Sequence, residues 1–349
     1  MERQILHVDV NNAFLSWSAI ERLKNGEEID IRKIPSAICG DENKRSGIIL
    51  AKSPLAKSMG VVTGETVYQA MKKCPSLKLY SVDFKTYRKY SDALYELLLE
   101  YTDKIERFSV DECFLDMTNY LMGDTLLYKA QEISKRVKNE LGFTVNIGIS
   151  TNKLLAKMAS DFSKPDKIHT LYPSEIKSKM WSLDVSELFM IGNKSVPKLN
   201  RMGIYKIGDL ARFDCNTLVR RLGKFGKMVW EYANGIDDSE VIYTSEKSKS
   251  IGNSITLPVD VSNSEKLESV LLSLVEHVTY RLRKENLLAG SASVQLRTKD
   301  FKDFSHQAKL DFATDNTNEI YAKAKNIFED MYTEGMAIRL IGFRVDKLK

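Results

Sequence analysis

Three acidic side chains stand beside apolar, strand-like runs in the first third of the chain. Asp9 closes the run that begins at Ile5, and Asp111 and Glu112 lie side by side between two apolar-alternating segments typical of a β-hairpin. Adjacent carboxylates repel each other, so a folded chain holds them together readily only where water or a cation relieves the charge. An Asp-Glu pair at a hairpin tip is most often simply solvated, and the upstream Asp9 is what favours a shared site.

Clustered carboxylates at a sheet edge suit hard cations. Mg²⁺ typically binds through one or two carboxylates together with substrate phosphates, and two such ions ~3.5–4 Å apart can clamp the attacking and leaving oxygens of a displacement at phosphorus. The sequence carries no Gly-x-x-x-x-Gly-Lys-Ser/Thr loop, no Gly-x-Ser-x-Gly elbow and no His-Glu-x-x-His motif that would offer competing chemistry. The four histidines, interpreted as structural or surface residues, are His7, His169, His277 and His306.

The elements around the acids predict how they meet. Outside the segment 12–80, apolar periodicity predicts strands at 4–10, 105–109, 113–117 and 143–150, and helices at 87–102 and 124–141. Asn152 is expected to cap a further helix at 153–162. In this split β-α-β-β-α-β pattern, strands one and two are parallel and strand three returns between them. The end of strand one then lies beside the hairpin tip, so we expect the three acids to converge at one edge of one sheet.

The middle of the chain is basic. Between Pro173 and Gly235 stand eleven Lys or Arg against six Asp or Glu, which indicates a polyanion-binding surface, with a solvated helical face as the alternative. Residues 191–204 are typical of a helix-hairpin-helix, whose backbone amides can take a DNA phosphate. Met190 stands where a first hairpin glycine is usual, and an ordinary helical turn is the alternative. The polar stretch 236–248 is predicted to be a linker.

The last hundred residues repeat the split pattern without the acids. Strands are predicted at 249–257, 291–299, 304–311 and 337–346, with helices at 264–285 and 316–333, so the whole chain is α+β. A sheet of this kind without an acidic cluster suggests binding rather than chemistry. The basic residues expected to track a phosphate backbone, unless they only solvate a sheet face, are Arg297, Lys299, Lys302, Arg339 and Arg344.

Composition restricts the class of protein. At 349 residues the chain exceeds one core, and 43% hydrophobic and 28% charged residues with a net charge of +5 describe a soluble protein. The four cysteines are scattered, so they predict reduced thiols in a reducing cytoplasm and make zinc unlikely as a ligand. No signal peptide is recognised, and no apolar run reaches the ~18 residues of a membrane span.

Several short motifs resemble the signature of the Y-family translesion DNA polymerases. They are His7-Val-Asp9, Ser109-Val-Asp-Glu112, Gly148-Ile-Ser150 with Asn152-Lys153, Ala156-Lys157, Ser163-Lys-Pro165 and, opening the last segment, Ser250-Ile-Gly-Asn. The resemblance spans essentially the whole chain in the right order and is greater to bacterial polymerase IV and polymerase V catalytic subunits than to eukaryotic members. It implies a right-handed polymerase with a palm (1–11 and 81–171), inserted fingers (12–80), a helical thumb (172–235), a linker (236–248) and a little finger (249–349).

The resemblance also implies the activity: low-fidelity, template-directed addition of dNTPs to a primer, without proofreading. Asp9, Asp111 and Glu112 match the catalytic carboxylates that hold two Mg²⁺ ions, and Val10 matches a position that lends a backbone carbonyl. Primer-template DNA and dNTP are the implied partners, with DNA contacts expected from Lys153, Gly192, Lys194 and Lys198 besides the basic residues of the last segment. A sliding clamp is a further expected partner, although no terminal clamp-binding peptide is recognised, and a monomer is expected.

The nucleotide side of the site matches less closely. Phe14 falls at the family's steric gate and Lys164 at its triphosphate lysine, with Asn12, Ala13 and Ser53 completing the expected contacts. Acidic and aromatic residues are usual where Asn11-Asn12-Ala13 stand, and polymerase IV relatives usually have a tyrosine and an arginine where this chain has Pro54 and Lys57. Lysine supplies charge but not the planar bidentate fork of arginine.

Two other functions fit part of the pattern. A nucleotide cyclase also uses metal-binding acids on a split β-α-β-β-α-β sheet, but it would not explain the basic helices or the second sheet. A catalytically idle DNA-binding protein would explain those elements, but it would not need the intact acid trio.

Overall fold

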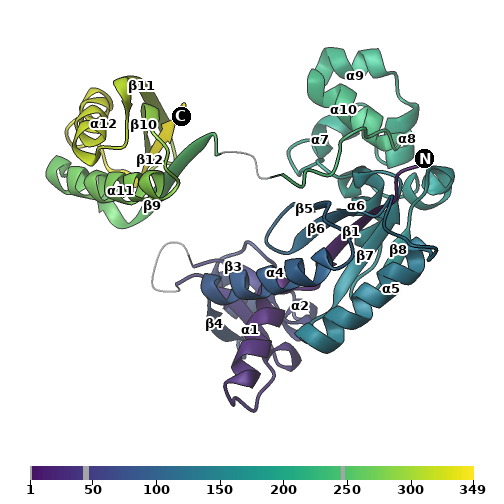
Figure 1. The fold of residues 1–349 in the computed structure, drawn as a ribbon. Coiled ribbons are helices and arrows are strands. Elements are labelled where there is room, and N and C mark those ends of the chain that lie inside the picture. The colour runs from purple at the N-terminus through teal and green to yellow at the C-terminus, as the bar shows by residue number, and fades with distance from the viewer. Residues whose placement is uncertain (1, 42–46, 245–247) are drawn as a thin grey trace. The chain divides into compact units, whose positions relative to one another are not determined.

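The computed structural model describes residues 2–41, 47–244 and 248–349, which form two compact units (Figure 1). Of the described residues, the first unit holds 2–39 and 48–244, and the second holds 40, 41, 47 and 248–349. Among the described residues, no helix has the length and apolar character needed to span a bilayer.

A five-stranded sheet with the order β5-β6-β1-β7-β8 organises the first unit. Its strands are β1 (Ile5–Val10), β5 (Ile105–Arg107), β6 (Glu112–Asp116), β7 (Val145–Ser150) and β8 (Ile168–Thr170). Strand β6 runs antiparallel to both β5 and β1, and β7 runs antiparallel to β1. The predicted order of the first four strands is therefore confirmed. The short strand β8, which pairs in parallel with β7, was not predicted.

The two faces of this sheet are covered differently. Alternate side chains such as Leu6 and Val8 point into a large apolar core with helices α4 (Phe84–Leu99) and α5 (Leu126–Arg136), and α5 continues into a π-helical turn, η2 (Val137–Leu141). The opposite face carries His7 and Asp9 and is covered by helix α6 (Lys153–Asp161), which Asn152 caps by accepting from Leu155 N at 2.8 Å. The acids thus lie on the face beneath α6.

Helix α6 lies unusually close to the sheet. A Cβ placed on Gly148 of β7 would lie 1.8 Å from the carbonyl oxygen of Ala156 and 2.6 Å from the amide nitrogen of Ser160. Only glycine leaves room for this contact between a strand and a helix backbone. The contact sets the height of the α6 side chains above the acids.

The segment predicted as fingers forms a small sheet with the order β3-β2-β4 and several short helices. Its elements are α1 (Ala13–Lys24), η1 (Ile31–Lys33), β2 (Ser36–Cys39), β3 (Ile49–Lys52), α2 (Pro54–Ser58), α3 (Val67–Lys73) and β4 (Lys78–Ser81). Helix α1 contributes Leu15, Trp17 and Ile20 to the core beneath the five-stranded sheet, so the start of this segment packs with the palm.

Residues 172–235 fold as short helices around a separate apolar cluster, which they share with Leu154, Leu155 and Met158 of α6. The helices are η3 (Pro173–Glu175), η4 (Ile176–Met180), η5 (Val185–Glu187), α7 (Val196–Asn200), α8 (Ile207–Arg212), α9 (Cys215–Leu222) and α10 (Lys224–Ala233). Met190, which stands where a hairpin glycine is usual, has a φ of 72°, the left-handed conformation that favours glycine.

The first part of the predicted linker is not free chain. Val241 is buried with Ile5, Phe114 and Ala156, and Asp237 accepts a hydrogen bond from Leu154 N at 3.0 Å. Ile242 N donates to Glu106 at 2.7 Å. Residues 237–242 therefore pack on the rest of the first unit. The side chain of Val241 is buried there, Asp237 accepts one hydrogen bond, and Ile242 N donates another. The remaining linker positions 245–247 lie outside the described residues.

The second unit has the predicted element order but a different sheet from the palm. Its elements are β9 (Ser250–Val261), α11 (Ser264–Lys284), β10 (Ala289–Thr298), β11 (Asp303–Thr314), α12 (Thr317–Met331) and β12 (Ile338–Asp346), with the strand order β11-β10-β12-β9. The predicted β-α-β-β-α-β pattern is confirmed, and a strand again lies between the two parallel strands β9 and β10. That strand is β12, the last of the unit, whereas in the five-stranded sheet it is β6, the third in chain order. Strand β11 is exposed along nearly its whole length and suits an edge, whereas β12 buries Ile341, Phe343 and Val345.

Candidate active site

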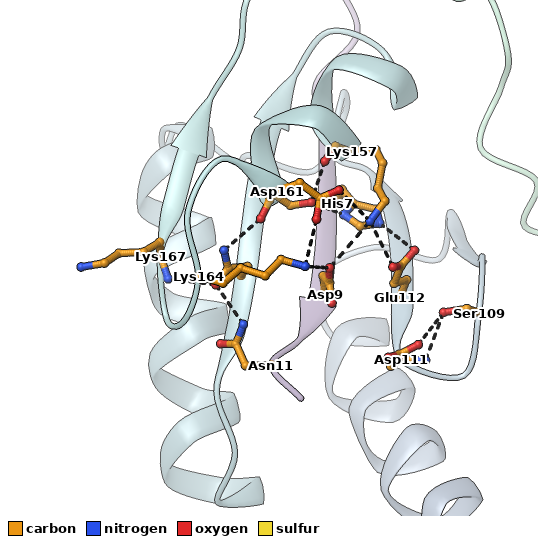
Figure 2. Close-up of polar contacts among 12 residues, drawn as sticks. His7, Asp9, Asn11, Ser109, Asp111, Glu112, Lys157, Asp161, Lys164 and Lys167 are labelled. Carbon is orange, nitrogen blue, oxygen red and sulfur yellow. Dashed lines mark hydrogen bonds and ion pairs between the residues drawn. The ribbon is translucent and has the colours of Figure 1, made fainter. Parts of the chain in front are cut away.

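The three predicted acids meet at one edge of the five-stranded sheet. Asp9 lies directly opposite Glu112 in the β1–β6 register, and Val10 N donates to the backbone oxygen of Asp111 at 3.0 Å. The Asp9 side of β1 and the Glu112 side of β6 face α6, as Figure 2 shows. The predicted convergence is confirmed at the level of strand register.

Two lysines lie over these carboxylates. Lys157 of α6, only 8% exposed, lies 3.1 Å from Glu112 and 3.7 Å from Asp9. Lys164, from the loop after α6, lies 2.5 Å from Asp9 (Figure 2). Asp161 contacts both ammonium groups, at 3.1 Å from Lys157 and 2.9 Å from Lys164. Burial disfavours the charge of Lys164, but Asp9 and Asp161 outweigh it and raise the pKa of Lys164.

His7 braces the same cluster from within the sheet. Its ring is fully buried, and Nδ1 lies 2.8 Å from Ser160 Oγ, which itself donates to the carbonyl of Lys157 at 2.8 Å. Its other nitrogen, Nε2, faces Glu112 Oε2 at 3.5 Å and has no hydrogen-bond partner among the residues that the structure describes. Burial opposes ionisation of Glu112, but His7 and Lys157 outweigh it and lower the pKa of Glu112 to about 2.

Asp111 is held differently from the other two acids. Its carboxylate accepts from Ser109 Oγ at 2.7 Å, and no lysine contacts it among the described residues (Figure 2). Burial, together with the charges of Asp9 and Glu112, raises the pKa of Asp111. In the described part of the chain, no three His, Cys, Asp or Glu side chains are arranged closely enough to hold a metal ion. The acids are therefore adjacent in the backbone, but their side chains are spread apart.

The residues expected at the nucleotide begin directly after β1. Asn12 has a left-handed backbone with φ 50° and donates from its side-chain amide to the carbonyl of Lys52 at 2.8 Å, which ties the start of α1 to the fingers sheet. Ala13 is buried. Phe14 is half-buried and stacks on Tyr87 of α4, with ring centroids 4.4 Å apart and planes 12° from parallel. The orientation of the Phe14 ring is therefore fixed by aromatic packing on Tyr87.

The fingers residues differ in their availability to a ligand. Ser53 is fully buried, and its hydroxyl accepts from Ala56 N and Ser36 N, both at 3.1 Å. The Ser53 hydroxyl therefore caps α2, and its expected nucleotide contact stays a prediction. Lys57 is exposed on α2. Lys52, which was not predicted, lies nearby and donates to Thr63 Oγ1 at 2.9 Å.

The predicted DNA contacts of the first unit separate into two kinds. Lys153 is mostly buried and pairs with Glu106 at 2.7 Å, which makes it a brace between α6 and β5 rather than a free cation. The ammonium group also donates to the carbonyl of Glu240 at 3.3 Å, and its expected DNA contact stays a prediction. Gly192, Lys194 and Lys198 are exposed around the start of α7. Neither of those two lysines makes an ion pair within the described residues.

The basic residues of the second unit do not form one stripe. Arg297 pairs with Asp303 at 2.8 Å and Arg344 with Asp346 at 3.2 Å. Arg339 lies over the ring of Phe301 at 4.7 Å, while Lys299 and Lys302 are exposed at the tip between β10 and β11. Helices α11 and α12 pack on one face of this sheet, and a polar hollow of about 660 Å³ lies on the sheet between residues such as Ser254, Ser293 and Gly342.

Sequence reasoning missed three residues of the cluster. Lys157 was seen only as part of a motif, Asp161 was not noticed, and His7 was interpreted as structural. A signal for two of them was present, because Lys157, Asp161 and Lys164 follow one another at spacings of four and three, which places charged groups on one side of a helix. Nothing in the local pattern shows that His7 lies beneath Glu112, since that contact comes from strand register.

Comparison with known proteins agrees with this geometry. Residues 8–161 match the impB/mucB/samB family, and residues 248–349 match the C-terminal domain of the same family. DNA polymerase IV of Clostridium acetobutylicum is 51% identical over 348 residues, which cover 100% of this chain and 88% of that protein. DNA polymerase IV of Acetivibrio thermocellus is 40% identical, over 100% of this chain and 86% of that protein.

The fold is similar to that of a solved Y-family polymerase. The Y-family DNA polymerase chimera Dbh-Dpo4(243-245)-Dbh aligns with a TM-score of 0.86 over 99% of both chains, at 23% sequence identity. That likeness concerns the fold, and the sequence matches concern the family. The chain therefore belongs to the impB/mucB/samB family of Y-family translesion DNA polymerases.

Proposed function

We propose that the protein is a DNA-directed DNA polymerase that adds dNTPs to a primer end by nucleotidyl transfer, including opposite damaged template bases. The observation that carries the proposal is the register of β1 and β6, which brings Asp9, Asp111 and Glu112 to one sheet edge. The relatives at 51% and 40% identity are named DNA polymerase IV, which supports the same activity.

The donor set suits divalent cations with oxygen ligands. The raised pKa of Asp111, caused by burial and by the charges of Asp9 and Glu112, is the behaviour of carboxylates that a nearby cation would relieve. Asp9, Asp111, Glu112 and the carbonyl of Val10 would hold two Mg²⁺ ions. When bound, these ions would supply charge stabilisation and activation of the primer hydroxyl.

The remaining residues would orient the substrates. Lys164 and Lys57 would contact the triphosphate, with Asn12 and Ala13 beneath it and Phe14 against the sugar. Exposed Lys194, Lys198, Lys299 and Lys302 would neutralise DNA phosphates, and the backbone amide of Gly192 would contribute a donor. The palm, fingers, thumb and little finger are proposed at the boundaries given above, with α1 packing on the palm. A sliding-clamp partner and a monomeric state stay predictions, as does a cytoplasmic location, with which the four free cysteines agree.

A nucleotide cyclase is not favoured. The family match at residues 248–349 and the basic helices between residues 172 and 235 have no role in that reaction. No second acidic cluster resembling a nuclease site was recognised in the sequence, so we also propose that the chain does not proofread.

Primer extension tests this function directly. The purified protein is incubated with Mg²⁺, four dNTPs and a primed template, undamaged or carrying a single lesion or abasic site. Template-dependent extension past the lesion supports the proposal. Formation of cyclic nucleotide without extension, or DNA binding without incorporation, would instead support one of the two alternatives.

Replacing Phe14 by alanine is expected to weaken discrimination against ribonucleotides. The ring fixed on Tyr87 would press on the sugar, and its removal leaves room for a 2′-hydroxyl, so rNTP use relative to dNTP use should rise by about 10- to 100-fold. Single-nucleotide incorporation with each substrate measures the ratio. Phe84→Ala, which removes another ring within 6.4 Å of Phe14 but on α4, is the matched control. A folded Phe14→Ala protein with the original ratio would remove Phe14 as the gate.

A further inference from the structure

The two lysines over the acids differ in their freedom to move. The ammonium of Lys157 lies within 4 Å of Asp9, Glu112 and Asp161, and its side chain is 10% exposed. The side chain of Lys164 is 40% exposed and contacts only two of these acids, Asp9 and Asp161. Lys157 is therefore a fixed counter-charge inside the site, whereas Lys164 has room to turn toward a ligand.

The ammonium of Lys164 cannot keep its close contact with Asp9 and bind a substrate phosphate equally well at the same time. Its 2.5 Å contact with Asp9 occupies a carboxylate that would also be needed for a cation. When an anionic triphosphate arrives with its cation, the Asp9 contact must be given up. The contact of Lys164 with Asp161 does not involve any of the proposed metal ligands and can persist.

Asp161 also sets the charge balance of the cluster. Two ammonium groups, on Lys157 and Lys164, face three carboxylates, on Asp9, Glu112 and Asp161. If Asp161 were neutral, the same two ammonium groups would face only Asp9 and Glu112. Both lysines would then bind those acids more tightly, and a cation–nucleotide complex would displace Lys164 less readily.

We propose that Asp161 is a positioning residue that holds Lys164 between Asp9 and an incoming nucleoside triphosphate. In the absence of substrate, Asp161 shares the ammonium with Asp9, and on substrate binding it keeps the lysine at the site while Asp9 is released to a cation. This inference rests on the proposed polymerase function and names a residue that acts through Lys164 rather than on the reacting atoms.

A double-mutant cycle tests the proposal. Asp161→Asn is expected to raise the half-saturating dNTP concentration about tenfold, equivalent to ~1.4 kcal/mol, in single-nucleotide incorporation at fixed Mg²⁺. In a Lys164→Gln background the same substitution should change it less than about twofold, because the lysine that Asp161 positions is gone. An equal change in both backgrounds overturns the proposal.

Asp166→Asn is the matched control, since Asp166 lies in the same loop and pairs with Lys138 at 2.8 Å. It should leave dNTP use unchanged, and an effect as large as that of Asp161→Asn also overturns the proposal. Thermal unfolding of the single and double variants gives a readout that does not depend on activity: the Asp161 and Lys164 substitutions should be non-additive there. If the unaltered protein does not extend primers, the proposed function fails, whereas additive unfolding shifts in an active enzyme contradict only the role of Asp161.

Discussion

Replacing Asp111 by asparagine should abolish primer extension, with a loss of about a thousandfold or more in the rate of incorporation, or ~4 kcal/mol. Asparagine keeps the shape of the side chain and can still contact Ser109, but it has no negative charge. Asp111 is the acid that no lysine neutralises among the described residues, so its charge is the one most available to a cation. Single-turnover incorporation at saturating dNTP measures the loss.

Asp92→Asn serves as the control for this prediction. Asp92 is a half-buried acid on α4 that pairs with Arg107 at 2.6 Å, and losing a pair near the surface typically costs only about 0–1 kcal/mol of stability. Its incorporation rate should match that of the unaltered protein. An Asp111→Asn protein that is folded and extends primers normally would remove Asp111 from the site.

Gly148→Ala should be the most damaging substitution for the fold. The new Cβ would lie 1.8 Å from the carbonyl oxygen of Ala156, so either β7 or α6 has to move. Neither backbone can move alone, because β7 is paired on both sides and α6 packs between the sheet and the apolar cluster of residues 172–235. We expect a loss of about 3 kcal/mol or more in the free energy of unfolding, measured by urea denaturation.

Gly192→Ala is the contrasting substitution. A Cβ on Gly192 would meet no atom within 4 Å, and its φ lies outside the left-handed region, so its stability should change by about 0.5 kcal/mol or less. If the two variants unfold alike, the close approach of α6 to β7 is not what fixes this part of the structure. If Gly148→Ala folds but loses activity, the activity depends on the distance between Lys157 and Glu112, which the position of α6 sets.

The sequence predicted four strands of the five-stranded sheet in the right order because their signals are local and periodic. The alternation around Asp111 predicted the hairpin, and the split pattern then placed Asp9 beside Glu112 without knowledge of any contact. Handedness of the crossover and strand order follow from general rules, so they transfer to this chain.

The contacts that the sequence did not reveal depend on long-range packing. A serine hydroxyl can bind a phosphate, but the hydroxyl of Ser53 is buried as a helix cap. Its environment depends on how β2 packs on α2, because it accepts from Ser36 N of β2 and Ala56 N of α2. The sequence around Lys153 does not identify Glu106 as its ion-pair partner, because only the fold brings these two residues together. The sheets of the two units share the same order of helices and strands but differ in which strand lies at the edge. The spacing of apolar residues does not distinguish these two arrangements.

The buried ring of His7 also makes the site observable without any substrate turnover. Its Nε2 faces Glu112 at 3.5 Å and has no hydrogen-bond partner in the described part of the chain, while Nδ1 lies within hydrogen-bond distance of Ser160. A change of charge or occupancy at Glu112 therefore acts on one ring nitrogen and not on the other. With only four histidines in the chain, the ¹⁵N resonances of His7 can be assigned by substitution. The imidazole is thus a native spectroscopic reporter, able to follow cation and nucleotide arrival at the carboxylates in real time.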